Sequence, residues 1–265
     1  MKEIKIVKLR STVSVSVTGT VCQLNCKHCG RHYLEDMVPI NRIDEIPPST
    51  KSILVSGGSK KNGEVPLSEH KEEIESLKKR FRLNFHTGLI QDDISVLKLA
   101  DAISFDFVGD DDVIKKVYNL NARVEDYVRS LEILMKITDR VYPHITIGLD
   151  CGKIGHEYKA IDILSRYDLK KVVFLVFIPT PRTVFEKCQP PEIEEIKSVF
   201  SYAREKFKCE LNLGCMYPKG NLRDQIAEAA VENGFNTLTQ ISEKMIDSLQ
   251  KREFNLIFQD ECCIF

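Results

Sequence analysis

Short apolar runs, rich in β-branched and aromatic residues, alternate with charged segments of helical spacing along nearly the whole chain. The expected strands are 13–19, 52–57, 82–87, 102–107, 141–150, 171–179, 209–216 and 235–240. The expected helices are 67–80, 124–137, 157–167, 193–207, 222–233 and 242–252. This alternation predicts a parallel sheet, because each crossover helix returns the chain to the end of the sheet from which it left.

About eight strand–helix units within 265 residues predict an α/β protein with a complete or near-complete (β/α) barrel of the TIM type. A doubly wound open sheet is the alternative. We expect residues 1–240 to form the barrel domain. Residues 241–265 are expected to form a C-terminal helix and a cysteine-bearing tail that packs on the barrel.

Charge and hydropathy exclude several classes of protein. Lys and Arg number 38 and Asp and Glu 39, so the net charge of −1 gives no reason to expect binding to nucleic acid or to a membrane surface. No apolar run approaches the roughly 18–20 residues that cross a bilayer. The first residues lack the apolar core of a signal peptide. We therefore expect a cytoplasmic protein.

Cysteine usage carries the most chemical information. The count is odd and far too low for a disulfide scaffold, with cysteines at positions 22, 26, 29, 151, 188, 209, 215, 262 and 263. In a cytoplasmic chain such thiols are kept reduced. They therefore indicate metal or redox chemistry more than structural disulfides.

Three of these cysteines follow the first expected strand in the pattern Cys22-x3-Cys26-x2-Cys29. Three thiolates within eight residues can converge on one metal centre. Zinc prefers four ligands, commonly as two separated pairs. A trio without a nearby fourth ligand suits an iron–sulfur cube with one open iron. A zinc knuckle, or cysteines without a shared role, are the alternatives.

This motif, placed after the first strand of a β/α barrel, resembles that of the radical S-adenosylmethionine (radical SAM) superfamily. The resemblance implies that Cys22, Cys26 and Cys29 are the catalytic residues and hold a [4Fe–4S] cluster. It also implies that the open iron binds the amino and carboxylate groups of S-adenosylmethionine. Reductive cleavage of that molecule would then give a 5′-deoxyadenosyl radical for hydrogen abstraction.

Other segments resemble cofactor-binding positions of the superfamily in the same order along the barrel. His28 stands where an aromatic residue is usual, and its ring could lie near the adenine. Gly57-Gly58 stands where a Gly-Gly-Glu-like motif touches the methionyl amine, although Ser59 replaces the acid. Gly148 resembles the glycine that packs against adenine, and Pro179-Thr180 resembles the strand end that borders the adenosine.

Two polar residues are singled out by their place at strand ends. Asp106 ends the fourth expected strand, where an acid could contact ribose hydroxyls or substrate. The alternative for Asp106 is a hydrogen-bonded core acid. His86 ends the third strand, as a substrate-pocket residue or as a satisfied residue of the barrel rim.

Most of the remaining cysteines are expected near the barrel mouth or in the tail. We predict that Cys151, Cys188, Cys215 and one or both of Cys262 and Cys263 bind a second, auxiliary [4Fe–4S] cluster. The alternatives are small buried apolar residues or, for the adjacent tail pair, a redox switch. Cys209 begins a strand at the opposite end and is assigned to packing.

Within the superfamily, the segments 142–148 and 178–181 most resemble biotin-synthase-like members, which with lipoyl synthases use an auxiliary cluster as a sulfur donor. The compact chain also resembles the two-protein lipoyl synthases of archaea. This resemblance implies a sulfurtransferase that acts on a small-molecule or acyl-carrier-protein-type substrate. It implies an electron donor such as ferredoxin and a second radical SAM protein as partners.

Two rival functions remain open. One is a single-cluster enzyme that catalyses rearrangement, cleavage or methyl transfer on a small molecule. The other is a cluster-binding module without turnover. The sequence does not identify the substrate, because one fold supports many reactions.

Overall fold

The computed structural model describes residues 2–91 and 93–265, which form alternating strands and helices. The strands are β1 (Glu3–Val7), β2 (Thr12–Ser16), β3 (Val38–Pro39), β4 (Ser52–Ser56), β5 (Arg82–Thr87), β6 (Ala102–Asp106), β7 (Val141–Ile147), β8 (Lys171–Val176), β9 (Glu210–Leu213), β10 (Thr237–Thr239) and β11 (Asn255–Gln259). The helices are α1 (Lys71–Lys78), α2 (Asp111–Val113), α3 (Val124–Ile137), α4 (His156–Leu164), α5 (Ile193–Lys206), α6 (Asn221–Glu232) and α7 (Glu243–Lys251).

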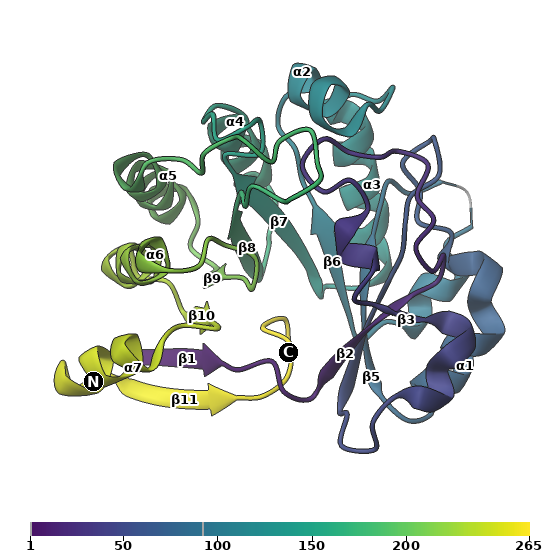
Figure 1. Cartoon of the computed structure of the whole chain (residues 1–265), viewed down its shortest axis with the longest axis horizontal. Coiled ribbons are helices and arrows are strands. Elements are labelled where there is room, and N and C mark those ends of the chain that lie inside the picture. The colour runs from purple at the N-terminus through teal and green to yellow at the C-terminus, as the bar shows by residue number, and fades with distance from the viewer. Residues whose placement is uncertain (1, 92) are drawn as a thin grey trace.

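The described strands form one parallel sheet in the order β11-β1-β10-β9-β8-β7-β6-β5-β4-β2-β3. The sheet curls, and the long helices α1 and α3–α7 cover its convex side (Figure 1). The expected α/β barrel of the TIM type is therefore confirmed as a curled, TIM-like sheet. Of the two expected forms, complete and near-complete, the complete ring is not formed, because the edge strands β3 and β11 are not paired with each other. The doubly wound alternative is wrong because the long helices share one side.

Helix-to-sheet packing follows from the apolar faces of both. On α5, Ile196, Val199, Phe200 and Ala203 recur at helical spacing and are fully buried. The ring of Phe200 lies 5.9 Å from that of Phe174 on β8. Burial of large side chains of this kind contributes about 1.5–3 kcal/mol each.

All eight expected strands are present, and three further strands were not expected. β1 lies between β10 and β11, so the C-terminal tail extends the sheet. β1 was not expected because charged residues alternate with its apolar ones, and β3 was not expected because it has only two residues. Residues 260–265 then turn into the space enclosed by the curled sheet (Figure 1). The division at residue 240 stays a prediction.

No helix in residues 2–91 and 93–265 combines the length and the apolar character needed to cross a bilayer.

Candidate active site

Because the strands are parallel, the loops that follow them meet at one rim of the curled sheet. Three loops matter here. The Cys loop, residues 17–34, follows β2; the β7–α4 loop is residues 148–155; and the β8–α5 loop is residues 177–192. Nearly all residues singled out in the sequence lie in these loops, at strand ends or in the tail.

The Cys loop carries a buried Cys26 and half-buried Cys22 and Cys29. A hydrogen bond between the thiols of Cys26 and Cys29 lowers the pKa of Cys29 to about 6; burial opposes this shift and the charge of His28 supports it. The same bond, burial and the charges of its two neighbours raise the pKa of Cys26. One thiolate therefore forms near neutral pH in this loop, as suits a soft-metal ligand.

The backbone after β4 lies directly against the Cys loop. A Cβ atom added to Gly58 would lie 2.0 Å from the carbonyl oxygen of Val21 and 2.6 Å from Cβ of Cys22. The Gly58 N–H donates to Oγ1 of Thr18 at 2.7 Å. A Cβ on Gly57 would lie 2.9 Å from a methyl carbon of Val17. Only glycine permits this approach of two backbones.

The segment after β6 supports the other side of the Cys loop. Helix α2 continues as a π-helical turn over residues 114–118. The Lys27 N–H donates to the carbonyl oxygen of Val117 at 2.9 Å, and the rings of His28 and Tyr118 pack edge-to-face 5.3 Å apart. Sequence analysis missed Tyr118. A π-helical turn at a functional site is a recurrent arrangement, but no sequence signal here marks it.

His86 at the end of β5 and Asp106 at the end of β6 form an ion pair, with 3.2 Å between Nε2 and Oδ1. Burial opposes both charges, but mutual attraction outweighs it, lowering the pKa of Asp106 to about 2 and raising that of His86. Their side chains nevertheless stay 29% and 41% exposed. The partly exposed surroundings of His86 and Asp106 are called the recess below. The charge of His28 helps to lower the pKa of Asp106, and the charge of Asp106 acts to raise the pKa of Cys29. The recess therefore adjoins the Cys loop.

His144 on β7 stands beside this pair and stays neutral. Its backbone is in register with that of Asp106, and its ring lies 5.5 Å from the ring of His86. Burial, with the charge of His86, lowers the pKa of His144 to about 4. Nδ1 lies 2.9 Å from the carbonyl oxygen of Tyr142. At neutral pH Nδ1–H therefore donates to that oxygen.

Three free thiols, Cys215, Cys262 and Cys263, lie close enough to act electrostatically on one another. Cys215 has an exposed side chain, yet burial, with the charge of Cys262, raises its pKa to about 12. Cys262 and Cys263 are free thiols, and a hydrogen bond between them raises the pKa of Cys262 and lowers that of Cys263. The charge of Cys262 also acts on His86. The structure thus groups these three thiols and places Cys262 near the ion pair, while their role as cluster ligands stays a prediction.

Buried polar side chains of the strands hold the tail. Asn212 on β9 donates from Nδ2 to the carbonyl oxygen of Cys263 at 3.1 Å. Nζ of Lys171 on β8 donates to the carbonyl oxygens of Cys263 and Ile264 at 3.3 and 3.4 Å. Nδ2 of Asn84 on β5 lies 3.9 Å from Sγ of Cys262. Polar groups inside a sheet require such partners, so the tail completes the interior.

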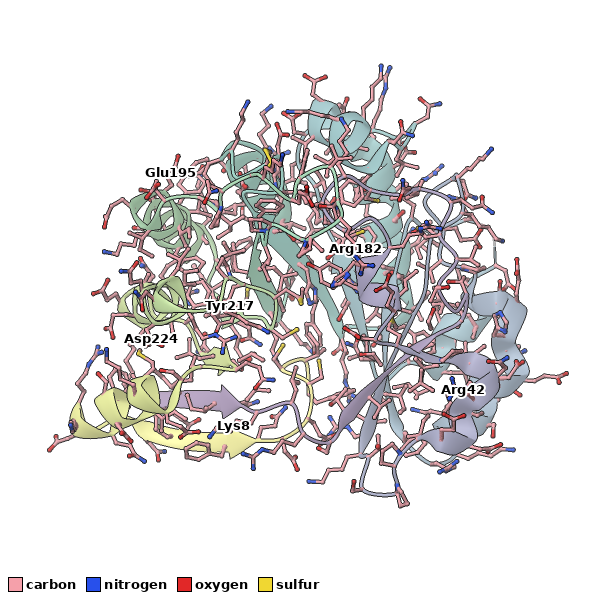
Figure 2. The ribbon with its side chains drawn as sticks, viewed as in Figure 1. Lys8, Arg42, Arg182, Glu195, Tyr217 and Asp224 are labelled. Carbon is pink, nitrogen blue, oxygen red and sulfur yellow. A yellow bond between two sulfur atoms is a disulfide. The ribbon has the colours of Figure 1, made fainter. Side chains whose placement is uncertain are left out.

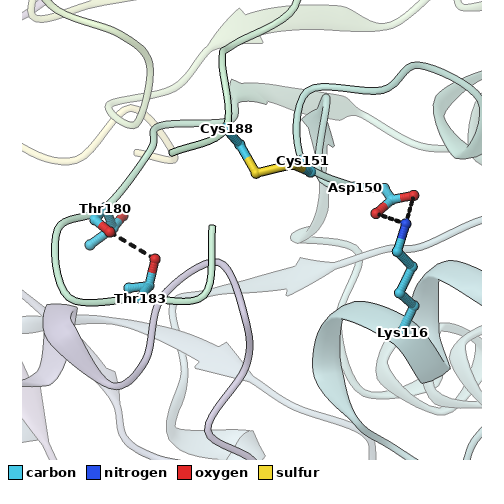
Figure 3. The surroundings of a disulfide bond; sticks show 6 residues. All are labelled: Lys116, Asp150, Cys151, Thr180, Thr183 and Cys188. Carbon is cyan, nitrogen blue, oxygen red and sulfur yellow. Dashed lines mark hydrogen bonds and ion pairs between the residues drawn. A yellow bond between two sulfur atoms is a disulfide. The ribbon is translucent and has the colours of Figure 1, made fainter. Parts of the chain in front are cut away.

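Cys151 and Cys188 do not join this group. They form a disulfide between the β7–α4 and β8–α5 loops, with Cα atoms 5.2 Å apart (Figure 3). They pack against the main core, whereas Cys262 and Cys263 belong to a second apolar cluster. The prediction that both act as thiolate ligands of an auxiliary cluster is wrong for this structure, because bonded sulfurs carry no thiolate.

The predicted adenosine-binding positions are engaged in loop packing. A Cβ on Gly148 would lie 2.3 Å from Cγ of Pro191. Thr180, next to Pro179, is buried, and its Oγ1 lies 3.0 Å from the hydroxyl of Tyr33. Sequence analysis missed Tyr33, which joins the β8–α5 loop to the Cys loop. Binding of a cofactor by Gly148, Pro179 or Thr180 stays a prediction.

The Cys loop fits a cluster by the chemistry of its donors. In residues 2–91 and 93–265, no three His, Cys, Asp or Glu side chains are already arranged around a metal position. Cys26 and Cys29 are free thiols that interact through a hydrogen bond, and Sγ of Cys22 lies 3.9 Å from the carbonyl oxygen of Ser59. Three soft sulfur donors on one short loop still suit iron–sulfur ligation. Ligation requires these side chains to turn away from one another.

Comparison with known proteins finds neither a matching family model nor a matching curated protein. Solved structures do match. Methylornithine synthase PylB has a TM-score of 0.63 and 14% identity, covering 96% of this chain and 84% of that one. SuiB of Streptococcus suis has a TM-score of 0.59 and 10% identity, covering 95% and 58%. An HMG-CoA lyase of Brucella melitensis has a TM-score of 0.59 and 11% identity, covering 97% and 93%.

These likenesses establish the fold. The chain spans only 58% of SuiB, which is also solved in complex with S-adenosylmethionine. The match to an HMG-CoA lyase is equally extensive. Since the same barrel architecture carries unlike chemistry, function must be argued from the residues of the site.

Proposed function

We propose that the chain is a radical SAM enzyme. The observation that carries the proposal is the Cys22–Cys26–Cys29 loop, which follows a barrel strand and is pressed against the backbone of Gly57 and Gly58. When bound there, a [4Fe–4S] cluster would supply the electron that cleaves S-adenosylmethionine to methionine and a 5′-deoxyadenosyl radical for C–H abstraction.

The residues of the chain bind, orient and shield the reactants. Cys22, Cys26 and Cys29 supply the sulfur ligands, and the low pKa of Cys29 favours its ligating form. The backbone at Gly57-Gly58 can approach a bound ligand because no Cβ intervenes. Asp106, kept ionised by His86, faces the recess beside the Cys loop and can accept hydrogen bonds from ribose or substrate hydroxyls.

The finer proposal is sulfur insertion, as in lipoyl synthases. It is supported by three free thiols, Cys215 after β9 and Cys262 and Cys263 in the tail, that act electrostatically on one another. An auxiliary [4Fe–4S] cluster held by these three would be the sulfur source. Cys151 and Cys188 no longer belong to its ligand set.

One observation favours the single-cluster alternative. The disulfide removes two of the five cysteines that were expected to serve a second cluster. An enzyme with only the Cys-loop cluster would catalyse rearrangement, cleavage or methyl transfer. In that case Cys262 and Cys263 serve to pack the tail into the sheet.

The proposed partners are an electron donor such as ferredoxin, an acyl-carrier-protein-type or small-molecule substrate, and a second radical SAM protein. The surface of the Cys loop suits an acidic donor, since it carries Lys27 and Arg31 and no acidic residue. Exposed apolar side chains accompany these charges: Val21 is 64% exposed and Val184 on the β8–α5 loop is 72% exposed.

The test is anaerobic reconstitution with iron and sulfide, followed by iron counting, Mössbauer spectroscopy and assay of 5′-deoxyadenosine. About eight irons per chain support the auxiliary cluster and about four support the single-cluster enzyme. The triple variant Cys22→Ala/Cys26→Ala/Cys29→Ala should lose about four irons and all cleavage, whereas Cys209→Ala should lose neither. Cleavage retained by the triple variant overturns the proposal. Bound iron without cleavage indicates a module without turnover.

A further inference from the structure

The disulfide between Cys151 and Cys188 lies at the rim of the site and joins two of its loops. Both cysteines are half-buried, so small reductants and oxidants can reach the sulfurs. The other seven cysteines, all within the described residues, are free thiols. A single accessible disulfide in a chain of free thiols is the kind that exchanges readily.

The backbone around the disulfide is tightly packed. Cys151 adopts a left-handed φ of 57°, which is unfavourable for a residue with a Cβ atom. A Cβ on Gly152 would lie 2.1 Å from the carbonyl oxygen of Gln189, and one on Gly148 would meet Pro191. The two loops therefore also touch at Gln189 and Pro191, next to the sulfur–sulfur bond, and these contacts help to hold the left-handed backbone of Cys151 in place.

The β8–α5 loop continues from the disulfide directly onto the Cys loop. The N–H of Cys188 donates a hydrogen bond of 3.1 Å to the carbonyl oxygen of Phe185 within a turn. The N–H of Phe185 in turn donates to the carbonyl oxygen of Lys27 at 3.1 Å. A Cβ on Gly30 would lie 3.3 Å from Cγ2 of Thr183. These contacts fall within the segment that contains Cys26 and Cys29.

Two side-chain contacts strengthen the attachment. The guanidinium of Arg182, which Figure 2 labels, lies 3.2 Å from a carboxylate oxygen of Glu35. The hydroxyl of Tyr33 lies 3.0 Å from Oγ1 of Thr180. Exposed ion pairs contribute little individually. The order of the β8–α5 loop therefore depends on its covalent end at Cys188 as well as on these contacts.

We propose that Cys151 and Cys188 form a thiol–disulfide exchange site whose redox state sets how firmly the β8–α5 loop holds the Cys loop. Reduction breaks the sulfur–sulfur bond and adds two electrons and two protons, giving two thiols. A dithiol supplies them and becomes a cyclic disulfide. Oxidation reverses the change, with a disulfide such as oxidised glutathione as electron acceptor. The proposal goes beyond the proposed reaction and does not depend on a bound cluster.

The experiment uses the full chain, prepared anaerobically and divided between dithiothreitol and oxidised glutathione. Alkylation and peptide mass spectrometry report the state of each cysteine. Limited trypsin cleavage after Arg182 and Lys187 reports the β8–α5 loop, and hydrogen exchange over residues 17–34 reports the Cys loop. We expect a 151–188 cross-linked peptide in the oxidised sample. Reduction should speed both cleavage and exchange roughly tenfold.

Matched variants separate the covalent link from other effects. Cys188→Ser should behave like the reduced chain and ignore the oxidant. Cys151→Gly removes the link but accepts the left-handed φ, so it should release the β8–α5 loop without residual strain. Cys209→Ser, which changes a thiol at the opposite end of the strands, should respond to the oxidant as the unmodified chain does.

Two results would overturn the proposal. One is free alkylation of Cys151 and Cys188 after oxidation, and the other is equal cleavage and exchange in the two redox states. If the chain bound no iron at all, the proposed reaction would fail while the thiol and protease measurements kept their meaning.

Discussion

Gly58 and Cys22 lie so close that a Cβ atom on the glycine would be 2.6 Å from the Cβ of the cysteine. The clash would extend to backbone, because the carbonyl oxygen of Val21 lies 2.0 Å from the same position. The first cysteine of the motif is therefore positioned by a glycine that follows a different strand.

We predict that Gly58→Ala displaces the start of the Cys loop. Backbone atoms cannot turn away as a flexible side chain can, so the loop must move or the β4 end must shift. Iron bound after anaerobic reconstitution should fall at least severalfold, and hydrogen exchange should rise over residues 17–34.

The control is Gly155→Ala. No atom lies within 4 Å of a Cβ at Gly155, whose φ of 167° is extended backbone. Iron content should stay at the level of the unmodified chain. Equal iron content in the Gly58 and Gly155 variants would contradict the prediction.

Much of the fold could be predicted from apolar runs and helical spacing. Expected strand 82–87 coincides with β5, and expected helix 124–137 coincides with α3. Strand β11 was not expected because its pattern, Asn255 to Gln259, lacks an inward-facing apolar alternation and exposes Phe258. Ring closure also could not be read from the sequence, since it depends on which edge strands finally meet.

The grouping of the first three cysteines was predictable because one short segment contains them. The Cys loop has its three cysteines in eight residues, so spacing alone groups them. Which of the other cysteines form a disulfide and which remain free thiols was not predictable. Cys151 and Cys188 are 37 positions apart, and only the three-dimensional course of two loops brings them together rather than toward Cys215.

Removing the disulfide should lower the thermal stability of the chain. For a 37-residue separation, the chain-entropy model gives a stabilisation of about 2–4 kcal/mol. In a chain of this size that corresponds to roughly 5–10 °C in Tm. Circular dichroism under non-reducing conditions should show this loss for Cys188→Ser. Dithiothreitol should bring the unmodified chain to the same Tm; no shift in either case would count against a stabilising link.

The neutral His144 should make stability depend on pH below neutrality. Its pKa is about 4 in the folded chain and 6.5 otherwise. The unfolded chain therefore binds a proton that the folded chain does not between these values, and stability falls as pH is lowered through this window. At pH 5 the free energy of unfolding is lower by about 2 kcal/mol than at neutral pH.

Urea unfolding of His144→Asn at pH 7.5 and pH 5 tests this assignment. The asparagine amide can still donate to the carbonyl oxygen of Tyr142 but does not titrate. The variant should lose less stability than the unmodified chain between the two pH values. His86 acts in the opposite sense: its raised pKa stabilises the fold below pH 6.5 and this effect fades as pH rises above it. The same pH slope in both proteins would show that His144 is not the group responsible.

Loss of the Asn212 amide should loosen the tail. Asn212 is fully buried, and its Nδ2 donates to the carbonyl oxygen of Cys263, itself only 4% exposed. Asn212→Ala leaves that carbonyl with Lys171 alone and removes about 1–2 kcal/mol of tail attachment. Maleimide labelling of Cys263 before iron is added should accelerate roughly 5–30-fold relative to Cys209, because opening of the tail exposes the thiol. Asn255→Ala removes an exposed contact between edge strand β11 and Glu3 on the neighbouring strand β1, and should leave the ratio unchanged. A matching ratio in both variants would mean that Asn212 does not hold the tail.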